Sequence, residues 1–199
     1  MRTITLPNGS LGADTVTPIT AAAALALKQE GFSFIGRYVT SLSQAELHII
    51  LQAGLAVTLF SYANSFDPSD EIRALKNLGI PPEVCVWLDV EGVTDDAITL
   101  QARINTWARA IKQASYTAGM YAGAQELLTS QELWNLAVTR YMKSCSRIVD
   151  RNGAIADVEL HSGWSCNQVA CQQQRGGVTV DVDVTYADYL GRKVTMVAA

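Results

Sequence analysis

The chain has 199 residues, of which 49% are hydrophobic and 17% charged, and its formal net charge at pH 7 is −4. These values are typical of one soluble globular domain with a large core, and no apolar stretch approaches the ~20 residues that cross a bilayer. The 15 lysines and arginines are scattered rather than gathered in a stripe, which argues against nucleic acid as a partner.

Strand-like and helix-like segments alternate from the N-terminus to about residue 143. We predict strands at 11–15, 33–38, 55–62, 84–91, 117–121, 138–142, 156–161 and 168–174. We predict helices at 19–29, 43–52, 68–78, 94–114 and 124–136. This alternation is typical of parallel strands joined by helical crossovers.

The fold class that we predict is α/β, a compact (β/α)8 barrel of the TIM type formed by a single domain over residues 1–199. Because no strong helix pattern follows residue 143, some late helices are expected to be shortened or missing. An open doubly wound sheet is the main alternative. Its usual phosphate-binding fingerprints, GxGxxG after the first strand and GxxxxGK[ST], are absent from the sequence.

The stretch VCVWLDVE, at 84–91, is an apolar strand that ends in two carboxylates. Asp89 and Glu91 are two positions apart, so in a strand their side chains would leave the same face, with Cα atoms roughly 6.5–7 Å apart. Two carboxylates in one cleft raise the pKa of at least one of them, which suits a general acid. The ordinary alternative is that both are solvated, with Asp89 capping the helix that follows.

Polar side chains recur at the carboxyl ends of the predicted strands, where barrels of this type collect their chemistry. They are Asp14, Arg37, Tyr38, Ser61, Tyr62, Asn64, Asp89, Glu91, Tyr121, Tyr141, His161, Gln172 and Gln174. Acids and amides bind hydroxyl groups and aromatic faces cover the apolar side of a sugar ring, so the set suits a carbohydrate. Each residue alone has an ordinary structural interpretation, and only their convergence supports a site.

The four cysteines leave three states open. We expect free structural thiols, and Cys85 in particular lies in an apolar strand where a thiol acts as a small hydrophobe. The alternatives are one local disulfide between Cys166 and Cys171, or a metal site that includes His161.

Seven motifs resemble, in order, a known family. They are Gly12-Ala13-Asp14-Thr15, Gly36-Arg37-Tyr38, Gly54-Leu55, Leu88-Asp89-Val90-Glu91, Gly119-Met120-Tyr121, a glutamine-containing strand and Val180-Asp181-Val182-Asp183. From about residue 12 to 190 the chain is similar to the glycoside-hydrolase-like domain catalogued as domain of unknown function 1906, which is itself similar to family 25 lysozymes. The resemblance implies a TIM-like barrel that acts on cell-wall glycan at the carboxyl ends of its strands.

The resemblance also implies roles for individual carboxylates. Glu91 matches the general acid, Asp89 its acidic neighbour, Asp14 the first-strand carboxylate and Asp181 the aspartate of the closing motif. Asp183 stands where asparagine is commoner. The sixth strand lacks the expected tryptophan and the Gln-Gln-Gln run lacks an aromatic neighbour, so the contacts to substrate depart from the family pattern.

The function that we expect is hydrolysis of the glycan strand of peptidoglycan, a muramidase-like reaction that uses no cofactor and no metal. Glu91 would protonate the leaving oxygen, while Asp89 or Asp14 would stabilise the oxocarbenium-like centre, orient an N-acetyl group or activate water. The expected substrate-binding residues are Arg37, Tyr38, Tyr62, Tyr121, His161, Gln172, Gln174 and Asp181.

Two rival functions stay open. The first is a non-catalytic module that binds cell-wall glycan in the same cleft. The second is a metal-assisted hydrolase such as an amidase, with ligands such as Asp157, His161 and Cys166.

The N-terminal stretch MRTITLPNGSLGADTV has no apolar core of the length found in a secretory signal peptide. We therefore expect a monomer that is made in the cytoplasm, has no membrane partner, and acts on the wall after release by a holin or a secretion system, as a phage endolysin does.

Overall fold

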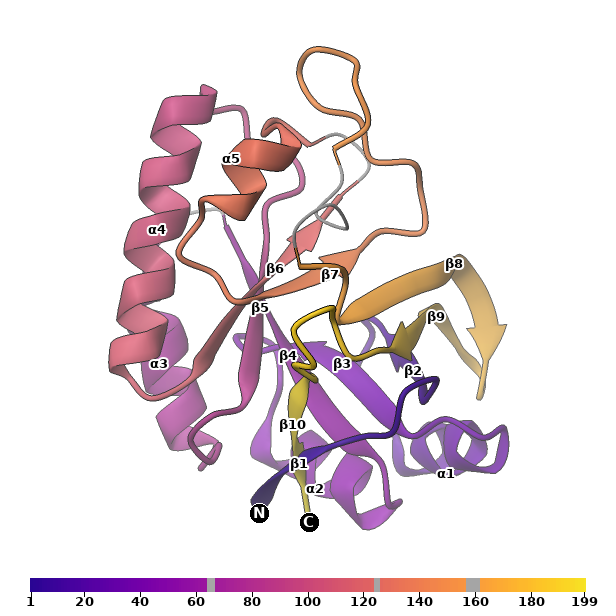
Figure 1. The fold of residues 1–199 in the computed structure, drawn as a ribbon. Helices are drawn as coiled ribbons and strands as arrows, with labels where there is room; N and C mark the ends of the chain where they lie inside the picture. The colour runs from indigo at the N-terminus through magenta and orange to yellow at the C-terminus, as the bar shows by residue number, and fades with distance from the viewer. Residues whose placement is uncertain (64–66, 124–125, 157–161) are drawn as a thin grey trace.

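The computed structural model describes residues 1–63, 67–123, 126–156 and 162–199. Within these ranges eight strands close into a barrel (Figure 1). In order around it they are β2 (Leu11–Asp14), β3 (Phe34–Tyr38), β4 (Ala56–Tyr62), β5 (Cys85–Asp89), β6 (Thr117–Ala122), β7 (Arg140–Lys143), β8 (Cys166–Arg175) and β9 (Val178–Thr185). The prediction of an α/β barrel of the TIM type is confirmed.

One strand runs against the others. Neighbouring strands from β2 to β8 are parallel, whereas β9 is antiparallel to both β8 and β2 and closes the ring between them. A hairpin at Gly176 and Gly177, both with positive φ, joins β8 directly to β9. The connection from β8 to β9 therefore needs no helix.

Helices cover the outside of the first half of the barrel (Figure 1). They are α1 (Ala21–Gln29), α2 (Gln44–Gln52), α3 (Pro68–Asn77), α4 (Ala97–Gln113) and the short α5 (Ser130–Trp134). Each begins behind a side chain that accepts a hydrogen bond from a backbone N–H of the first turn, and these caps are Thr20, Ser43, Asp67, Asp96 and Thr129. Because such caps satisfy N–H groups that have no partner inside the helix, they define where each helix starts.

The late part of the chain departs most from the prediction. The helix expected at 124–136 is reduced to α5, and the described residues between β7 and β8 contain no helix, in agreement with the expected loss of late helices. The strand expected at 156–161 falls mainly outside the described residues. Three strands were not predicted: β1 (Arg2–Thr5), β9 and β10 (Thr195–Ala198), of which β1 and β10 are only four residues long.

The two termini lie side by side because β1 pairs antiparallel with β10, and β10 in turn pairs with β4 (Figure 1). Ile4 and Leu6 from the N-terminal segment, with Val194 and Met196 from the C-terminal segment, pack against the side chains inside the barrel. This ribbon closes the amino-terminal end of the barrel. None of the described helices has the length and apolar character that a membrane span requires.

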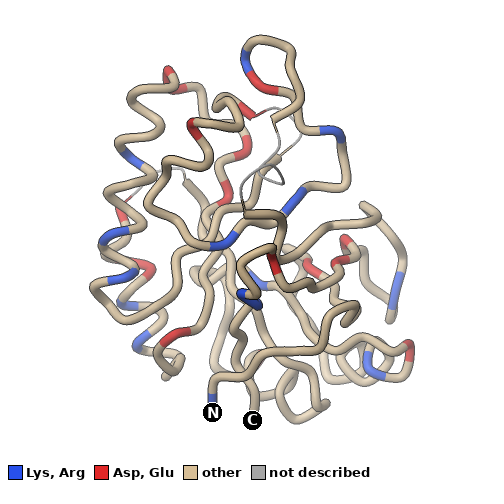
Figure 2. The backbone as a smooth tube through the Cα atoms, in the orientation of Figure 1, with Lys and Arg blue, Asp and Glu red and all other residues tan. Residues whose placement is uncertain are grey.

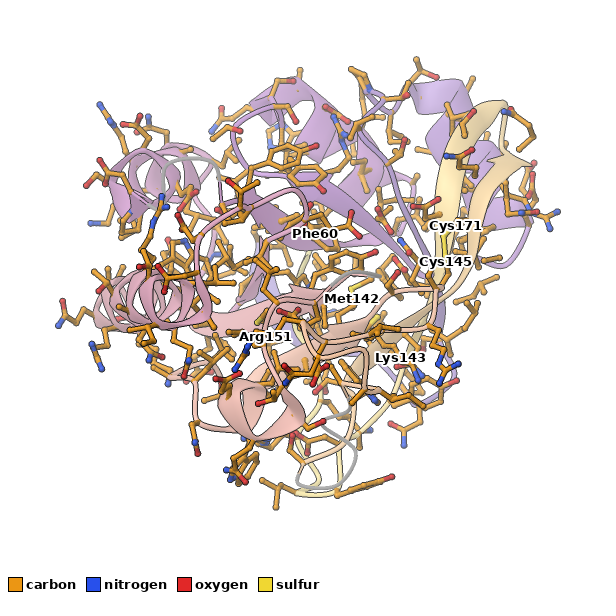
Figure 3. The ribbon with its side chains drawn as sticks, turned by 90° about the horizontal axis from the view of Figure 1, so that it is seen from above. Phe60, Met142, Lys143, Cys145, Arg151 and Cys171 are labelled. Atoms are coloured by element: carbon orange, nitrogen blue, oxygen red, sulfur yellow. A yellow bond between two sulfur atoms is a disulfide. The ribbon has the colours of Figure 1, made fainter. Side chains whose placement is uncertain are left out.

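Large aromatic rings fill the inside of the barrel because glycines face them. A Cβ atom at Gly12 would overlap the ring of Phe34, and one at Gly119 would overlap the ring of Trp87. Phe60 belongs to the same buried cluster and lies near the middle of the barrel when the molecule is seen from above (Figure 3). These rings form an apolar floor below the carboxyl ends of the strands.

The contact between Gly12 and Phe34 predicts a loss of stability. Gly12→Ala must displace the Phe34 ring within a packed interior, so we expect the free energy of unfolding to fall by ~1–3 kcal/mol. Urea denaturation followed by tryptophan fluorescence measures this free energy of unfolding. As a control, adding Phe34→Leu to Gly12→Ala should recover part of the loss; an unchanged denaturation midpoint in Gly12→Ala would contradict this account of the floor.

Candidate active site

Four aspartates converge at the open end of the barrel. Asp14 ends β2 and Asp89 ends β5, while Asp181 and Asp183 lie on β9. In the antiparallel register of β2 and β9, Asp14 is opposite Asp181 and Gly12 is opposite Asp183. The reversed direction of β9 thus places two aspartates, two residues apart, beside the carboxylate of β2.

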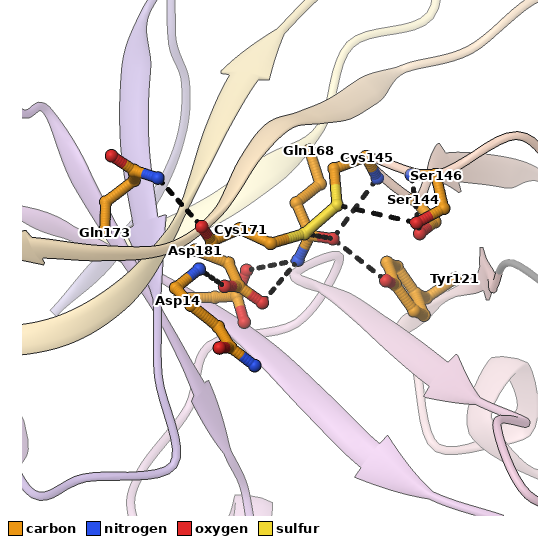
Figure 4. Close-up of a disulfide and its surroundings, with 10 residues drawn as sticks. Asp14, Tyr121, Ser144, Cys145, Ser146, Gln168, Cys171, Gln173 and Asp181 are labelled. Carbon is orange, nitrogen blue, oxygen red and sulfur yellow. Dashed lines mark hydrogen bonds between the residues drawn. A yellow bond between two sulfur atoms is a disulfide. The ribbon is translucent and has the colours of Figure 1, made fainter.

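Gln168 connects this acidic group to the other side of the barrel (Figure 4). Its Nε2 donates to Oδ2 of Asp14 at 3.2 Å and to Oδ2 of Asp181 at 3.0 Å. Its Oε1 accepts from the Tyr121 hydroxyl at 3.0 Å and from the backbone N–H of Cys145 at 3.3 Å. Because both ends of the amide are engaged, its N–H groups are held toward the two carboxylates.

Gln172 and Gln174 were the site residues predicted on this strand, whereas Gln168 was not predicted. The alternation of inward and outward residues is broken by irregularities in the β8–β9 pairing after Gln168 and Ala170, so counting by twos along the strand fails. Gln172 has an exposed side chain and contributes its backbone N–H to Asp181 Oδ1 at 2.6 Å. Gln174 is exposed on the hairpin. The available signal for Gln168 was its spacing of two from the inward-facing Cys166.

Asp89 and Glu91 do not leave one face of a strand as predicted, because β5 ends at Asp89. Asp89 is 5% exposed; its Oδ2 accepts from the Tyr38 hydroxyl at 2.7 Å and its Oδ1 from the backbone N–H of Glu91 at 2.9 Å. That second bond turns the chain, and Glu91 follows in the turn with an exposed side chain. The Glu91 carboxyl lies over Gly123, where a Cβ would come within 2.5 Å of Oε1. Burial is the main cause of the raised pKa of Tyr121, and the charge of Glu91 adds to it.

Burial controls the ionisation of the aspartates. The pKa of Asp14 is raised to about 7, first by burial and then by the charge of Asp181, while hydrogen bonds from Gln168 and Asp183 act in the opposite direction. Burial also raises the pKa of Asp89, against the hydrogen bonds that it accepts. Burial is thus the main cause of the raised pKa of Asp89, and repulsion by Glu91 is not among its causes.

Aromatic side chains border the acids. Tyr38 and Tyr62 stack with ring centroids 3.8 Å apart and planes at 8°, and Tyr62 is 42% exposed. A groove of about 280 Å³ runs beside them and is lined among others by Asp14, Tyr38 and Asp181. Acids next to an exposed ring form the combination that a sugar ring requires.

Arg37, expected to bind substrate, lies on the other face of its strand. It is completely buried, its Nε donates to Glu46 Oε1 at 2.7 Å, and its guanidinium also donates to the carbonyl of Thr15. The prediction for Arg37 is wrong because alternation along β3 turns Phe34, Gly36 and Tyr38 into the barrel and Arg37 outward, toward α2.

Two other polar residues from the strand ends also point outward. The hydroxyl of Ser61 donates to Glu71 and that of Tyr141 to the carbonyl of Leu133. His161 and Asn64 lie outside the described residues.

The expected free buried thiol is confirmed for Cys85, whereas a disulfide forms between two cysteines that the sequence did not pair. Cys145, after β7, forms a disulfide with Cys171 on β8, with Cα atoms 6.4 Å apart (Figure 4). Cys85 and Cys166 are buried free thiols. Cys166 belongs to the cluster of side chains buried inside the barrel. Among the described residues, no three His, Cys, Asp or Glu side chains are arranged to hold a metal ion. Lysines and arginines are dispersed along the backbone (Figure 2).

Comparison with known proteins supports the fold. No protein-family model matches the sequence, and no curated protein matches it significantly. An uncharacterized protein of B. stearothermophilus superposes with a TM-score of 0.68 at 17% identity, over 89% of this chain and 96% of its own. The bacterial lysozyme from Streptomyces coelicolor superposes with a TM-score of 0.60 at 13% identity, over 92% and 94%. A sugar phosphate isomerase/epimerase from Parabacteroides distasonis gives a TM-score of 0.51 at 10% identity, over 70% and 66%.

The barrel therefore has the fold of a bacterial lysozyme. At these identities the likeness extends to the fold alone. The finer resemblance to domain of unknown function 1906 has no support from a family model.

The disulfide predicts a stability difference between the oxidised and the reduced protein. It joins residues 26 positions apart, so its loss should lower the free energy of unfolding by ~3 kcal/mol through the entropy of the unfolded chain. Thermal unfolding of the double variant Cys145→Ser/Cys171→Ser measures the effect, and dithiothreitol treatment of the unmodified protein should reproduce it. Unfolding that is insensitive to dithiothreitol would contradict the pairing.

The raised carboxyl pKa values predict that stability falls as pH rises. Asp14 and Glu126 have pKa values of about 7, and that of Asp183 is well above its ordinary value, so the folded protein keeps protons that the unfolded chain releases above pH ~4. We expect the free energy of unfolding to be at least ~1 kcal/mol lower at pH 8 than at pH 5. Carboxyl groups whose pKa is lowered, such as Glu132, make the free energy of unfolding depend on pH only below about pH 5.

Urea denaturation at the two pH values measures this difference. Asp14→Asn and Glu126→Gln should each reduce it, since each removes one group that gains a proton on folding. A free energy of unfolding that rises from pH 5 to pH 8 would contradict the assignment.

Proposed function

We propose that this protein is a glycoside hydrolase that cleaves the glycan strand of bacterial peptidoglycan, in a muramidase-like reaction. The observation that supports it most is the arrangement at the open end of a lysozyme-like barrel: an exposed carboxyl at Glu91, a buried carboxyl at Asp89 and the stacked rings of Tyr38 and Tyr62. A glycosidase needs two carboxyl groups beside a bound sugar.

The two carboxyls have different surroundings, which supports different roles. Glu91 lies at the surface, where it can reach the oxygen of a glycosidic bond and give up a proton. Asp89 accepts two hydrogen bonds, from Tyr38 and from the Glu91 backbone, so its position is held and its orientation defined. It would stabilise the positive charge that develops on the sugar or orient an N-acetyl group of the substrate.

Asp14 completes the set from the opposite side. Its charge and that of Asp89 influence each other, and Gln168 keeps it oriented. The Tyr62 ring would support the apolar face of a sugar, and Tyr38, Tyr121, Asp181 and the edge of the hairpin at Gln172 would contact neighbouring hydroxyl groups.

Action at the cell wall, after release by a holin or a secretion system, is part of the same proposal. The disulfide between Cys145 and Cys171 supports it, since disulfides persist in oxidising compartments and are rare in the reducing cytoplasm.

A non-catalytic glycan-binding module is the second candidate. It is favoured by the exposure of Glu91, because acid catalysis requires the bound glycan to cover this carboxyl from water, whereas binding alone does not.

The proposal predicts that Glu91→Gln abolishes turnover. The side chain is exposed, so the fold should be retained, while loss of the general acid should lower the rate of reducing-end release from purified peptidoglycan by ~100-fold or more. Glu83→Gln is the matched control, since Glu83 is also exposed and lies before β5, at the other end of the barrel. Full turnover in Glu91→Gln would refute the assignment, and wild-type protein that sediments with cell walls but releases no reducing ends would favour the binding module.

A further inference from the structure

Asp183 is the most deeply buried acid of the site. Its side chain lies on the inward face of β9 with 0% exposure, and neither carboxyl oxygen has a hydrogen-bond donor among the described residues. An ionised carboxylate in such a place loses its hydration without compensation, which is among the most costly situations in a protein interior.

The neighbours of Asp183 among the described residues offer no positive charge. Asp14 faces it from β2, Cys166 and Gln168 face it from β8, and Asp181 lies two residues away on its own strand. The Gln168 amide donates to Asp14 and to Asp181 instead of to Asp183. The charges that act on Asp183 among the described residues are thus those of Asp14 and Asp181, and both are acidic.

We propose that Asp183 is a positioning residue that stays protonated and donates its proton in a hydrogen bond to the carboxylate of Asp14. The register of β2 and β9 places Asp183 beside Asp14, and a side-chain hydrogen bond between the two carboxyls affects the pKa of both. This hydrogen bond stabilises both carboxyl groups. Asp183 is buried as a neutral acid, which costs less than burying an anion, and its O–H becomes a second donor to Asp14 beside the amide of Gln168.

This arrangement determines how Asp14 can act. Above the pKa of Asp14, which is about 7, the pair carries one proton, which resides on Asp183, so Asp14 presents an oriented carboxylate to the groove. The inference rests on the proposed function for its consequence, because Asp14 is one of the carboxylates assigned there. The hydrogen bond itself can be tested without any glycan.

The test is the titration midpoint of Asp14, followed through the carboxyl ¹³C signals of the folded protein and assigned with Asp14→Asn. A protonated donor at 183 lowers the pKa of Asp14, so Asp183→Ala should move the midpoint upward by ~1 pH unit. Asp183→Asn keeps an N–H donor of nearly the same shape and should leave the midpoint near that of the wild type.

An ionised Asp183 would give shifts of the Asp14 titration midpoint in the opposite direction. Its negative charge would raise the pKa of Asp14, so both Asp183→Ala and Asp183→Asn would move the midpoint downward, and that result would overturn the proposal. An unchanged midpoint in Asp183→Ala would overturn it as well. If Asp183→Ala does not fold, Asp183→Asn alone decides between an unchanged and a lowered midpoint.

The pH dependence of activity provides a second, independent test of the hydrogen bond. On purified peptidoglycan, Asp183→Ala should move the acid limb of the pH–rate profile upward, while Asp183→Asn should leave it in place and remain active. If the wild-type protein releases no reducing ends, the proposed function fails, but the ¹³C titration still decides the state of Asp183.

Discussion

The structure depends on keeping three aspartates together in one poorly solvated part of the barrel, which we call the acidic corner. None of the described neighbours acting on these aspartates is cationic. Asp14, Asp181 and Asp183 meet because β9 is antiparallel to β2, which brings alternate residues of one strand beside the end of the other. Three negative charges placed so close together would repel one another strongly. The acidic corner is stable because Gln168 donates to two of the carboxyls and because protons, held at higher pH than usual, reduce the total charge.

The rest of the site is built to hold Gln168 in this orientation. An amide can bind either way round, but here its oxygen accepts from the Tyr121 hydroxyl and from the backbone N–H of Cys145, so its nitrogen must face the acids. The disulfide between Cys145 and Cys171 ties the segment after β7 to β8 and thereby fixes the second of these donors. Where helices no longer cover the barrel, a covalent link and a polar network supply the rigidity that a packed helix provides elsewhere.

The likeness to a bacterial lysozyme agrees with a carbohydrate site, yet it concerns the path of the chain and not its chemistry. Many unrelated activities share such barrels, so the function is argued from the side chains at the strand ends. These side chains separate into two groups across the opening. On one side are Asp89, Glu91 and the stacked tyrosines, and on the other is the acidic corner of Asp14 with the aspartates of β9.

Much of the fold could be predicted because it follows from local patterns. The strands up to β7 are apolar runs between turn residues, and helix starts such as Ser43 and Asp67 are capping side chains recognisable one residue before the helix. Asp14, Asp89 and Glu91 could be placed at the open end for the same reason, since each ends or follows a recognisable strand, whereas Asp181 was named only through the resemblance of its motif. Gln168 and Asp183 were not identified as partners, because that depends on strand pairing.

The sequence by itself determined the barrel class and the gathering of acids and tyrosines, because the periodicity of strands and helices is a local property of the chain. Only the tertiary structure decided the antiparallel closure by β9, the outward direction of Arg37, the turn that separates Glu91 from Asp89, and the pairing of Cys145 with Cys171. Each of these depends on register, on bulges or on the direction of a neighbouring strand. Such relations join residues that are far apart in the sequence, so no local pattern records them.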